Sequence, residues 1–171
     1  MVCNRMVGFV RSVVINMAVA VILVISPLAA EKPLVFISSF ATGDAGAIHA
    51  FRLDVERGTL AAVNQWTDVE NPFFLALSAD GNRLYSIHAP QFGGPDHSEV
   101  AAYTILDANG KLDLLNRQTA LGTTACYLDV SASGRTVVVA NYGSGSVASF
   151  PVNRDGSLKP AATFVQHQGM S

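Results

Sequence analysis

The residues best suited to chemistry stand next to two short glycine-rich segments. His88 comes just before the segment PQFGGPDHSE, and the pair Asn141 and Tyr142 comes just before the segment GSGS. An imidazole near neutral pH can take or give a proton, while an amide and a phenol can hold a polar substrate by hydrogen bonds. Together with His167, these residues form our set of candidate pocket residues. The simpler alternative is that Asn141 caps a turn and Tyr142 packs on a neighbouring element.

Two sharper kinds of site fit the sequence less well. The segment GSGS looks like a turn that presents a nucleophilic serine, but it lacks the G-x-S-x-G pattern and a following helix. A metal site could be drawn around the first glycine-rich segment, yet the flexible spacing and the absence of a second cluster favour solvated loop residues. We therefore predict no metal site and no cofactor. The residues concerned are His88, Asp96, His97 and Glu99.

The elements that must position these residues are repeated along the chain. Three segments share alternating apolar residues followed by a polar pair, a glycine, any residue and a leucine: AIHAFRLDVERGTL, VAAYTILDANGKL and VASFPVNRDGSL. The first two are 52 residues apart, counted from Ile48 to Val100, and the third follows the second after 47 residues, at Val147. A second motif, Ser-Ala-x-Gly, recurs after 53 residues, from Ser78 to Ser131. Self-similarity at this spacing indicates a repeat architecture.

Each repeat predicts four short strands, because apolar and polar residues alternate between turn signals and no helical period follows the N-terminal segment. Four strands in about 50 residues are typical of one blade of a β-propeller. The first repeat starts at PLVFISSF, which matches the second strand of a blade. The sequence therefore predicts an all-β propeller fold with about 2.75 four-stranded blades present. The blades are expected at 31–66 (incomplete), 72–120 and 124–167.

Closure of such a ring takes roughly four to eight blades, so we expect missing C-terminal blades to be needed. Residues 31–171 alone should leave blade faces unburied, and we predict that they associate and are inactive. A free-standing β-sandwich of about 11 strands is the alternative architecture. A sandwich, however, does not require the spacing of the motifs to repeat.

The first 30 residues predict export. Two arginines precede an apolar run from Met17 to Ile25, and small residues follow, ending at Ala30. This is the order of a signal peptide, and the run is shorter than the roughly 20 residues that span a bilayer. We expect a periplasmic or secreted protein with no stable membrane insertion after cleavage. If residues 1–30 are not removed, they would act as an N-terminal membrane anchor.

Charge and cysteine content argue against a nucleic-acid partner and against a disulfide. The chain has 11 Lys plus Arg against 13 Asp plus Glu, a formal net charge of -2. Such a balance provides no basic surface for nucleic acid, so no nucleic-acid partner is expected. Cleavage after Ala30 would leave Cys126 as the only cysteine and exclude an intramolecular disulfide. We predict that Cys126 is a buried structural thiol.

Two longer segments carry a family resemblance. NPFFLALSADGNRLYSIH (71–88) and GTTACYLDVSASGRTVVVANYGSGSVASFPVNRDGSLKPAATFVQHQG (122–169) resemble blades of the lactonase family of seven-bladed propellers. That family includes propeller-type 6-phosphogluconolactonases and muconate-lactonising cyclases. The resemblance is most specific in VANYGSGSV, DGSL and VQHQG. It implies hydrolysis of a small sugar lactone, with water attacking the ester carbonyl and hydrogen-bond donors or cations holding the oxyanion.

The chain departs from the family pattern near the expected pocket. Ile87 and His88 stand where a family blade often has Asn-Glu, and Tyr127 stands where a histidine commonly follows the cysteine. The family's histidine and arginine motifs would follow His167, so the resemblance places the catalytic residues beyond Ser171. A muconate-type cyclase remains an alternative. So does a non-catalytic periplasmic or extracellular binding scaffold, because a fold does not fix function.

Overall fold

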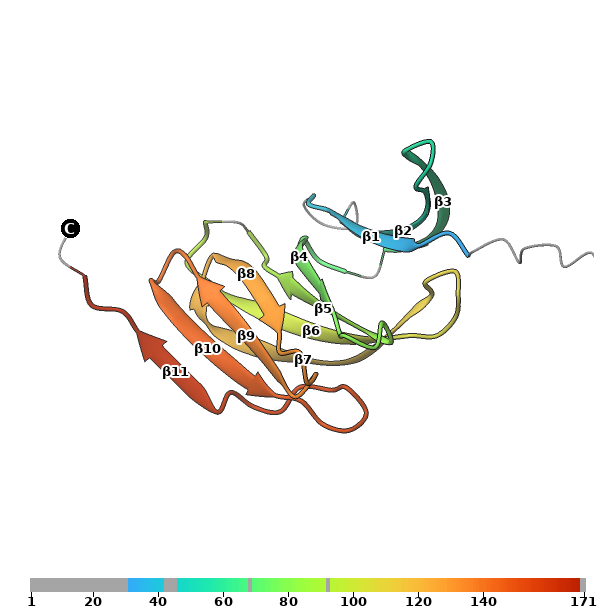
Figure 1. Cartoon of the computed structure of the whole chain (residues 1–171). Helices are drawn as coiled ribbons and strands as arrows, with labels where there is room; N and C mark the ends of the chain where they lie inside the picture. Colours follow the sequence, from blue (N-terminus) through green and yellow to red (C-terminus); the bar gives the residue numbers. More distant parts are fainter. Residues whose placement is uncertain (1–30, 42–45, 68, 92, 170–171) are drawn as a thin grey trace, which may run out of the picture. The chain divides into compact units, whose positions relative to one another are not determined.

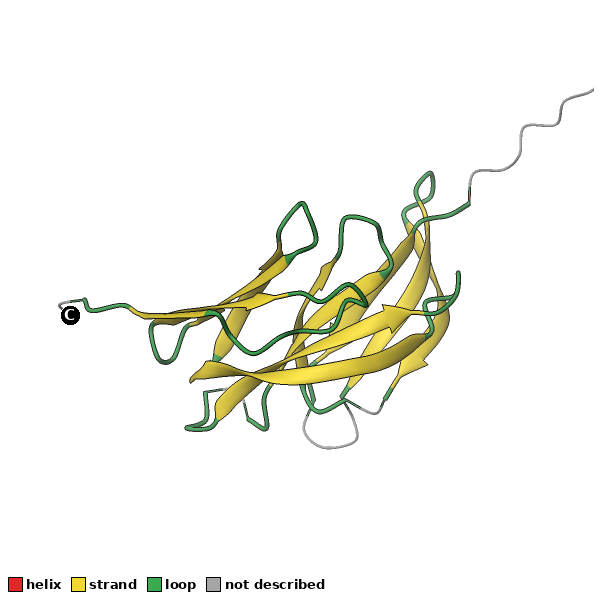
Figure 2. Cartoon of the chain, turned by 90° about the horizontal axis from the view of Figure 1, so that it is seen from below, coloured by secondary structure: helices red, strands yellow, loops and turns green. Residues whose placement is uncertain are grey.

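The computed structural model describes residues 31–41, 46–67, 69–91 and 93–169. The predicted signal peptide or anchor, residues 1–30, lies outside the described residues. Within these ranges the secondary structure consists of strands, with no helix (Figure 2). Consequently, no helix in the described part of the chain is long and apolar enough to cross a membrane.

The strands form three antiparallel sheets, and each sheet follows the order of the chain (Figure 1). Three sheets in series, of three, four and four strands, confirm the all-β prediction of partial propeller blades and make the sandwich alternative wrong. The first sheet contains β1 (Leu34–Ser39), β2 (Ala47–Asp54) and β3 (Thr59–Trp66). The second contains β4 (Pro72–Leu77), β5 (Arg83–His88), β6 (His97–Ile105) and β7 (Leu112–Thr123). The third contains β8 (Ala125–Val130), β9 (Thr136–Asn141), β10 (Ser146–Pro151) and β11 (Thr163–Gln166).

The Ser-Ala-x-Gly segments form the turns that lead from β4 to β5 and from β8 to β9. Gly81 and Gly134 have φ angles of 69° and 67°, a left-handed conformation that glycine adopts without a steric penalty. The first serine of each turn, Ser78 or Ser131, accepts the backbone N–H that opens the next strand, at 3.0 and 3.1 Å. The repeated motif therefore encodes a repeated turn.

The core consists of two clusters, one on each side of the second sheet. Tyr85 and Val100 pack with Val139 and Phe150 of the third sheet, and Leu84 and its neighbours pack with the first. Successive residues of β5 point to opposite faces, so Leu84 and Tyr85 are both buried, in different clusters. Full burial of each such side chain contributes about 1.5–3 kcal/mol. The second sheet is thus held between its two neighbours.

The last strand of the third sheet, β11, begins six residues after the turn formed by residues 153–157. The side chain of Leu158 is buried, and Asn116 of β7 bonds both its N–H and its carbonyl, at 2.9 and 2.7 Å. Pro160 follows and has no N–H to offer a strand partner. The segment therefore crosses toward the second sheet before β11 begins at Thr163.

The sheets have two distinct ends. We call one of them the connector end. It holds the connections between successive sheets and the loops from β1 to β2, from β5 to β6 and from β9 to β10. At the opposite end, the turn end, lie the segments 55–58, 78–82, 106–111, 131–135 and 152–162. All four candidate pocket residues lie at the connector end.

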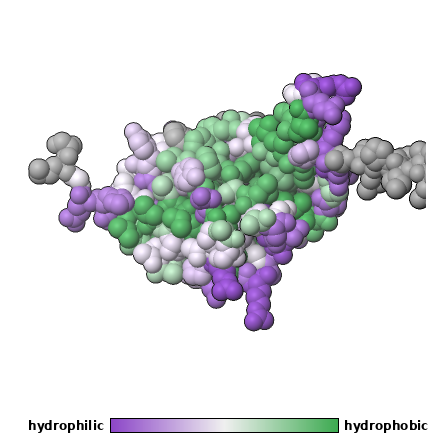
Figure 3. Space-filling model, in the orientation of Figure 1, coloured by the Kyte–Doolittle hydropathy of each residue, from purple (hydrophilic) through white to green (hydrophobic). Residues whose placement is uncertain are grey.

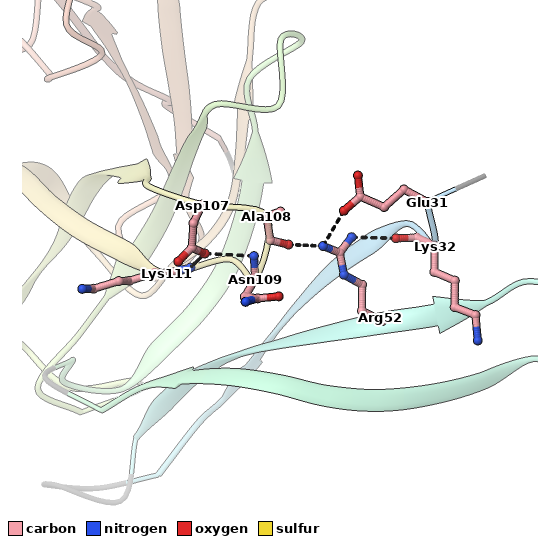
Figure 4. Close-up of polar contacts among 7 residues, drawn as sticks. All are labelled: Glu31, Lys32, Arg52, Asp107, Ala108, Asn109 and Lys111. Atoms are coloured by element: carbon pink, nitrogen blue, oxygen red, sulfur yellow. Dashed lines mark hydrogen bonds and ion pairs between the residues drawn. The ribbon is translucent and has the colours of Figure 1, made fainter. Parts of the chain in front are cut away.

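Arg52 fixes the start of the described chain at the turn end (Figure 4). Its guanidinium donates to the Lys32 carbonyl at 2.7 Å, to a Glu31 carboxylate oxygen at 2.8 Å and to the Ala108 carbonyl. The turn that carries Ala108 is closed by Asp107, which accepts two backbone N–H groups. Arg52 thereby joins the first sheet to the second.

Candidate functional site

His88 ends β5 and is buried at the connector end, with 2% of its surface exposed. Its Nδ1 lies 3.0 Å from the Glu70 carbonyl and its Nε2 lies 3.1 Å from the Tyr103 hydroxyl. A carbonyl can only accept, so Nδ1 carries the proton and Tyr103 donates to Nε2. Burial lowers the pKa of His88 to about 4, against the opposing effect of the Glu70 carbonyl. His88 is therefore neutral at pH 7 and holds the connector between the first two sheets.

Asn71 completes this connection, although the sequence did not draw attention to it. Its side-chain N–H groups donate to the carbonyls of Ala89 and Pro90, at 2.9 and 2.8 Å. Its φ angle is 41°, a left-handed conformation that asparagine tolerates better than most residues. The dipeptide Asn71-Pro72 is a recognised turn signal and could have revealed the residue. Asn71 and His88 together fix the base of the loop that follows β5.

Asn141 occupies the corresponding place in the third sheet and is also buried. Its side-chain N–H groups donate to the Ala120 carbonyl at 3.0 Å and to Ser146 Oγ at 3.2 Å, while its Oδ1 is buried without a hydrogen-bond partner. Gly122 leaves just enough room, because a Cβ there would overlap the Asn141 amide. Asn141 thus ties the end of β7 to the turn after β9.

Tyr142 and His167 are the exposed members of the candidate set. The Tyr142 side chain is 80% exposed, and its backbone N–H donates to the Thr124 carbonyl at 2.9 Å. The His167 side chain is also exposed, and its N–H donates to the Gly145 carbonyl at 2.9 Å. Both residues therefore adjoin the turn between β9 and β10, whereas His88 lies in the second sheet. Among the four candidates, these two can meet a ligand directly.

The residues weighed for a metal do not gather into a site. Asp96 and His97 are exposed, and Glu99 pairs with Arg117 at 3.2 Å. Across the residues that the structure describes, no group of three or more His, Cys, Asp or Glu side chains could hold a metal ion.

The hydroxyls of the GSGS segment serve the turn. Ser144 Oγ lies 2.8 Å from Ser146 Oγ and accepts the Thr123 N–H at 3.2 Å. The two hydroxyls contact each other, a backbone N–H and the Asn141 amide, so these contacts stabilise the turn and do not form a serine–histidine pair. Cys126 is only partly buried, unlike the prediction, because the strand bulges between Ala125 and Tyr127.

The comparison with known families decides what these sheets are. Residues 34–171 match the family model described as lactonase, seven-bladed β-propeller. The chain belongs to this lactonase family. Its three sheets are therefore blades. Strands β4 and β8 are the edge strands of their sheets and contact each other, which makes them the innermost strands of the second and third blades.

Relatives with assigned names support the same family. The chain is 33% identical over 138 residues to 6-phosphogluconolactonase of Bacillus subtilis, covering 81% of this chain and 38% of that one. A Bacteroides fragilis protein proposed to be a 6-phosphogluconolactonase has 32% identity and a TM-score of 0.72, over 84% of this chain and 38% of that one. The periplasmic gluconolactonase PpgL of Pseudomonas aeruginosa has 26% identity and a TM-score of 0.66, over 80% of this chain and 39% of that one. The chain spans about 38% of the length of the curated relatives it matches.

Proposed function

We propose that the protein hydrolyses a sugar lactone and that its substrate binds at the connector end of the blades. The observation that carries this proposal is membership of the lactonase family together with 33% identity to a named 6-phosphogluconolactonase. In the reaction, water adds to the lactone carbonyl and the ring C–O bond breaks. The products are an open-chain carboxylate and a proton.

The described residues would contribute binding and support to this reaction. Tyr142 and His167 are exposed and can donate hydrogen bonds to substrate oxygens. His88 and Asn141 are buried and act as positioning residues for the loops that carry the site. The general base that activates water is proposed to come from further blades, since His88 is neutral and both of its nitrogens are hydrogen-bonded.

A chimera tests the activity directly. Residues 34–171 would replace the matching 38% of the Bacteroides fragilis relative. Proton release from D-glucono-1,5-lactone and from its 6-phosphate would be followed at constant pH, with heat-inactivated chimera giving the spontaneous rate. Hydrolysis of either lactone above that rate supports the proposal. A chimera that melts cooperatively and hydrolyses neither lactone contradicts it and favours a binding scaffold.

Two variants of the chimera test the proposed pocket. Tyr142→Phe and His167→Ala each remove one exposed hydrogen-bonding group, and a loss of about 1 kcal/mol would lower kcat/KM roughly five-fold. Val55→Ala, in the exposed 55–58 turn at the opposite end of the blades, is the matched control and should leave kcat/KM unchanged. Equal values for all three variants would remove Tyr142 and His167 from the site.

We also propose that the protein is exported and that residues 1–30 direct the export. The support is the order of basic, apolar and small residues in this segment, together with a relative named as periplasmic. Mass spectrometry of the protein recovered from fractionated cells would test it. A periplasmic or secreted product that starts at Glu31 supports cleavage, and an intact product in the membrane fraction supports an anchor. An intact product in the cytosol would refute export.

A further inference from the structure

Two aromatic rings meet at equivalent positions on the innermost strands of the second and third blades. Phe74 of β4 and Tyr127 of β8 are 53 residues apart in sequence, and their ring centroids lie 4.8 Å apart with planes tilted by 53°. Tyr127 is 50% exposed, whereas Phe74 packs against the core between the two blades. Tyr127 thus presents a ring surface, and Phe74 supports it.

Both strands are irregular at this position. The pairing of β4 with β5 shifts between Pro72 and Leu75, and the pairing of β8 with β9 shifts between Ala125 and Tyr127. Bulges re-aim side chains and are frequent beside active sites. The same irregularity in two successive blades places an aromatic ring near the connector end of each innermost strand.

A second aromatic pair joins Phe40, which follows β1 of the first blade, to Phe73 of β4. The rings of Phe40 and Phe73 lie 5.8 Å apart, edge to face, and Phe40 is 43% exposed. We call Phe40, Phe73, Phe74 and Tyr127 the aromatic belt. Figure 3 shows that apolar surface is broad on the face turned to the viewer. Ring surfaces of this kind suit the C–H face of a sugar ring, as pockets commonly combine aromatic walls with a few polar groups.

Charge is distributed unevenly between the two ends of the blades. Of the eleven Lys and Arg residues, Arg5 and Arg11 lie outside the described part of the chain. Six of the other nine lie in or directly beside segments of the turn end, and Lys32 and Arg52 lie at the same end, where Arg52 binds the Ala108 carbonyl. The ninth, Arg117, lies within β7 and pairs with Glu99. The connector end instead carries the exposed carboxylates of Glu70 and Asp96. A phosphate group would meet repulsion from these blades and no cation within their described loops.

From the aromatic belt and this charge distribution we infer that the substrate is an uncharged sugar lactone whose ring stacks on Tyr127. The inference rests on the proposed lactone hydrolysis and specifies its substrate class. Tyr127 contacts the ring, and Phe74 is a positioning residue that fixes the tilt of Tyr127. Between the two lactones named above, the protein should prefer the one without a phosphate.

The first test measures rates in the chimera described above, because residues 31–171 alone are expected to be inactive. The unsubstituted chimera serves as wild type in both tests. We expect kcat/KM for D-glucono-1,5-lactone to exceed that for the 6-phosphate at least ten-fold. Tyr127→Leu keeps an apolar contact with Phe74 but removes the ring, and should raise KM for the neutral lactone about three- to ten-fold with little change in kcat. Tyr127→Phe should retain the wild-type KM, and Val55→Ala, in the exposed 55–58 turn, is the matched surface control. A preference for the 6-phosphate, or equal KM values for Tyr127→Leu and wild type, would overturn the inference.

The second test needs no hydrolysis. Saturation-transfer NMR with D-gluconolactam, a stable analogue of the lactone, should show transfer to the ring C–H protons in wild type and Tyr127→Phe. The transfer should be lost in Tyr127→Leu, whose fold is checked by its melting curve. If transfer is seen but no lactone is hydrolysed, the stacking site on Tyr127 is supported and only the proposed hydrolytic activity is refuted. No transfer in wild type would refute the stacking site.

Discussion

His88 and Asn141 stand 53 residues apart in sequence, at the same position in successive blades. Each is the last residue of its blade's second strand and each is buried, yet they differ in chemistry. His88 holds the Glu70 carbonyl of the connector that enters its blade, and Asn141 holds the Ala120 carbonyl near the end of β7. Two different side chains thus perform one task, which is to fix a junction between blades.

The buried His88 should make stability depend on pH. The folded protein keeps the pKa of His88 at about 4, below the ordinary value of 6.5, because burial disfavours the imidazolium. Between these two pH values the unfolded chain binds more protons, so stability falls as the pH falls from 6.5 to 4. The contribution of this residue is about 3 kcal/mol over that window. Urea unfolding at pH 4.5, 5.5 and 7.5 measures it.

His88→Asn provides the matched variant, since asparagine fills this position in the next blade. At pH 7.5 we expect a loss of about 1–3 kcal/mol, because the Tyr103 hydroxyl or the Glu70 carbonyl loses its partner. Between pH 4.5 and 7.5 the variant should change less in stability than wild type. An unchanged pH dependence would show that His88 does not titrate as described.

Gly122→Ala should disturb the junction around Asn141. A methyl group at this position would overlap the Asn141 amide and Ser144 Oγ, so the turn after β9 must move. We expect a loss of about 1–3 kcal/mol, the usual range for overpacking. Gly169→Ala is the control, because no atom lies within 4 Å of its Cβ position. Thermal unfolding of the two variants gives the comparison. Equal melting temperatures would show that the close approach of Gly122 to Asn141 is unimportant.

Tyr85→Phe should weaken the contact between the second and third blades. The buried Tyr85 hydroxyl donates to the carbonyl of Gly156 at 3.1 Å, and Gly156 lies in the segment between β10 and β11 of the third blade. Removing it leaves a carbonyl without this donor and costs about 1 kcal/mol. Urea unfolding gives the value, and the exposed Tyr142→Phe serves as the reference substitution. A smaller loss for Tyr85→Phe than for Tyr142→Phe would contradict the assignment.

Residues 31–171 expressed alone should self-associate and show no lactonase activity. Val138, Phe164 and Val165 are 41–46% exposed on the third blade, and exposed apolar side chains that lie together favour association. Light scattering across a concentration series, combined with the lactone assay, tests both parts. A monodisperse monomer with a cooperative melt would contradict the association, and hydrolysis by this segment would contradict its inactivity.

The repeat spacing predicted the fold well because it reports physical repeats. Alternation over the segment Val137–Val139 places two valines in the core and leaves Val138 exposed, as a period of two requires. The Ser-Ala-x-Gly motifs formed the same turn twice. Each of these signals is local, so one sequence sufficed to find it.

The candidate site was harder to predict, because burial and partners at a junction come from residues distant in sequence. The sequence drew attention to His88 and Asn141. Whether they face a ligand or the interior depends on their hydrogen-bond partners, the carbonyls of Glu70 and Ala120, which are 18 and 21 residues away. The Asn71-Pro72 dipeptide marked a turn, but the buried hydrogen bonds of Asn71 go to residues 18 and 19 positions away and gave no local signal. Strand β11 begins only at Thr163 because the backbone N–H and carbonyl of Leu158 are hydrogen-bonded to the Asn116 side chain. This contact spans 42 residues, so no local pattern predicts it.

The guanidinium of Arg52 joins residues made at different times during synthesis. The three strands of the first blade leave the ribosome before Ala108, whose carbonyl is one of its acceptors. The hairpins β1–β2 and β2–β3 contain only local pairings, whereas the anchoring of the first blade must wait for the turn between β6 and β7. Contacts that close long loops form late. The blade that is synthesised first is therefore expected to be secured only after the second blade has folded.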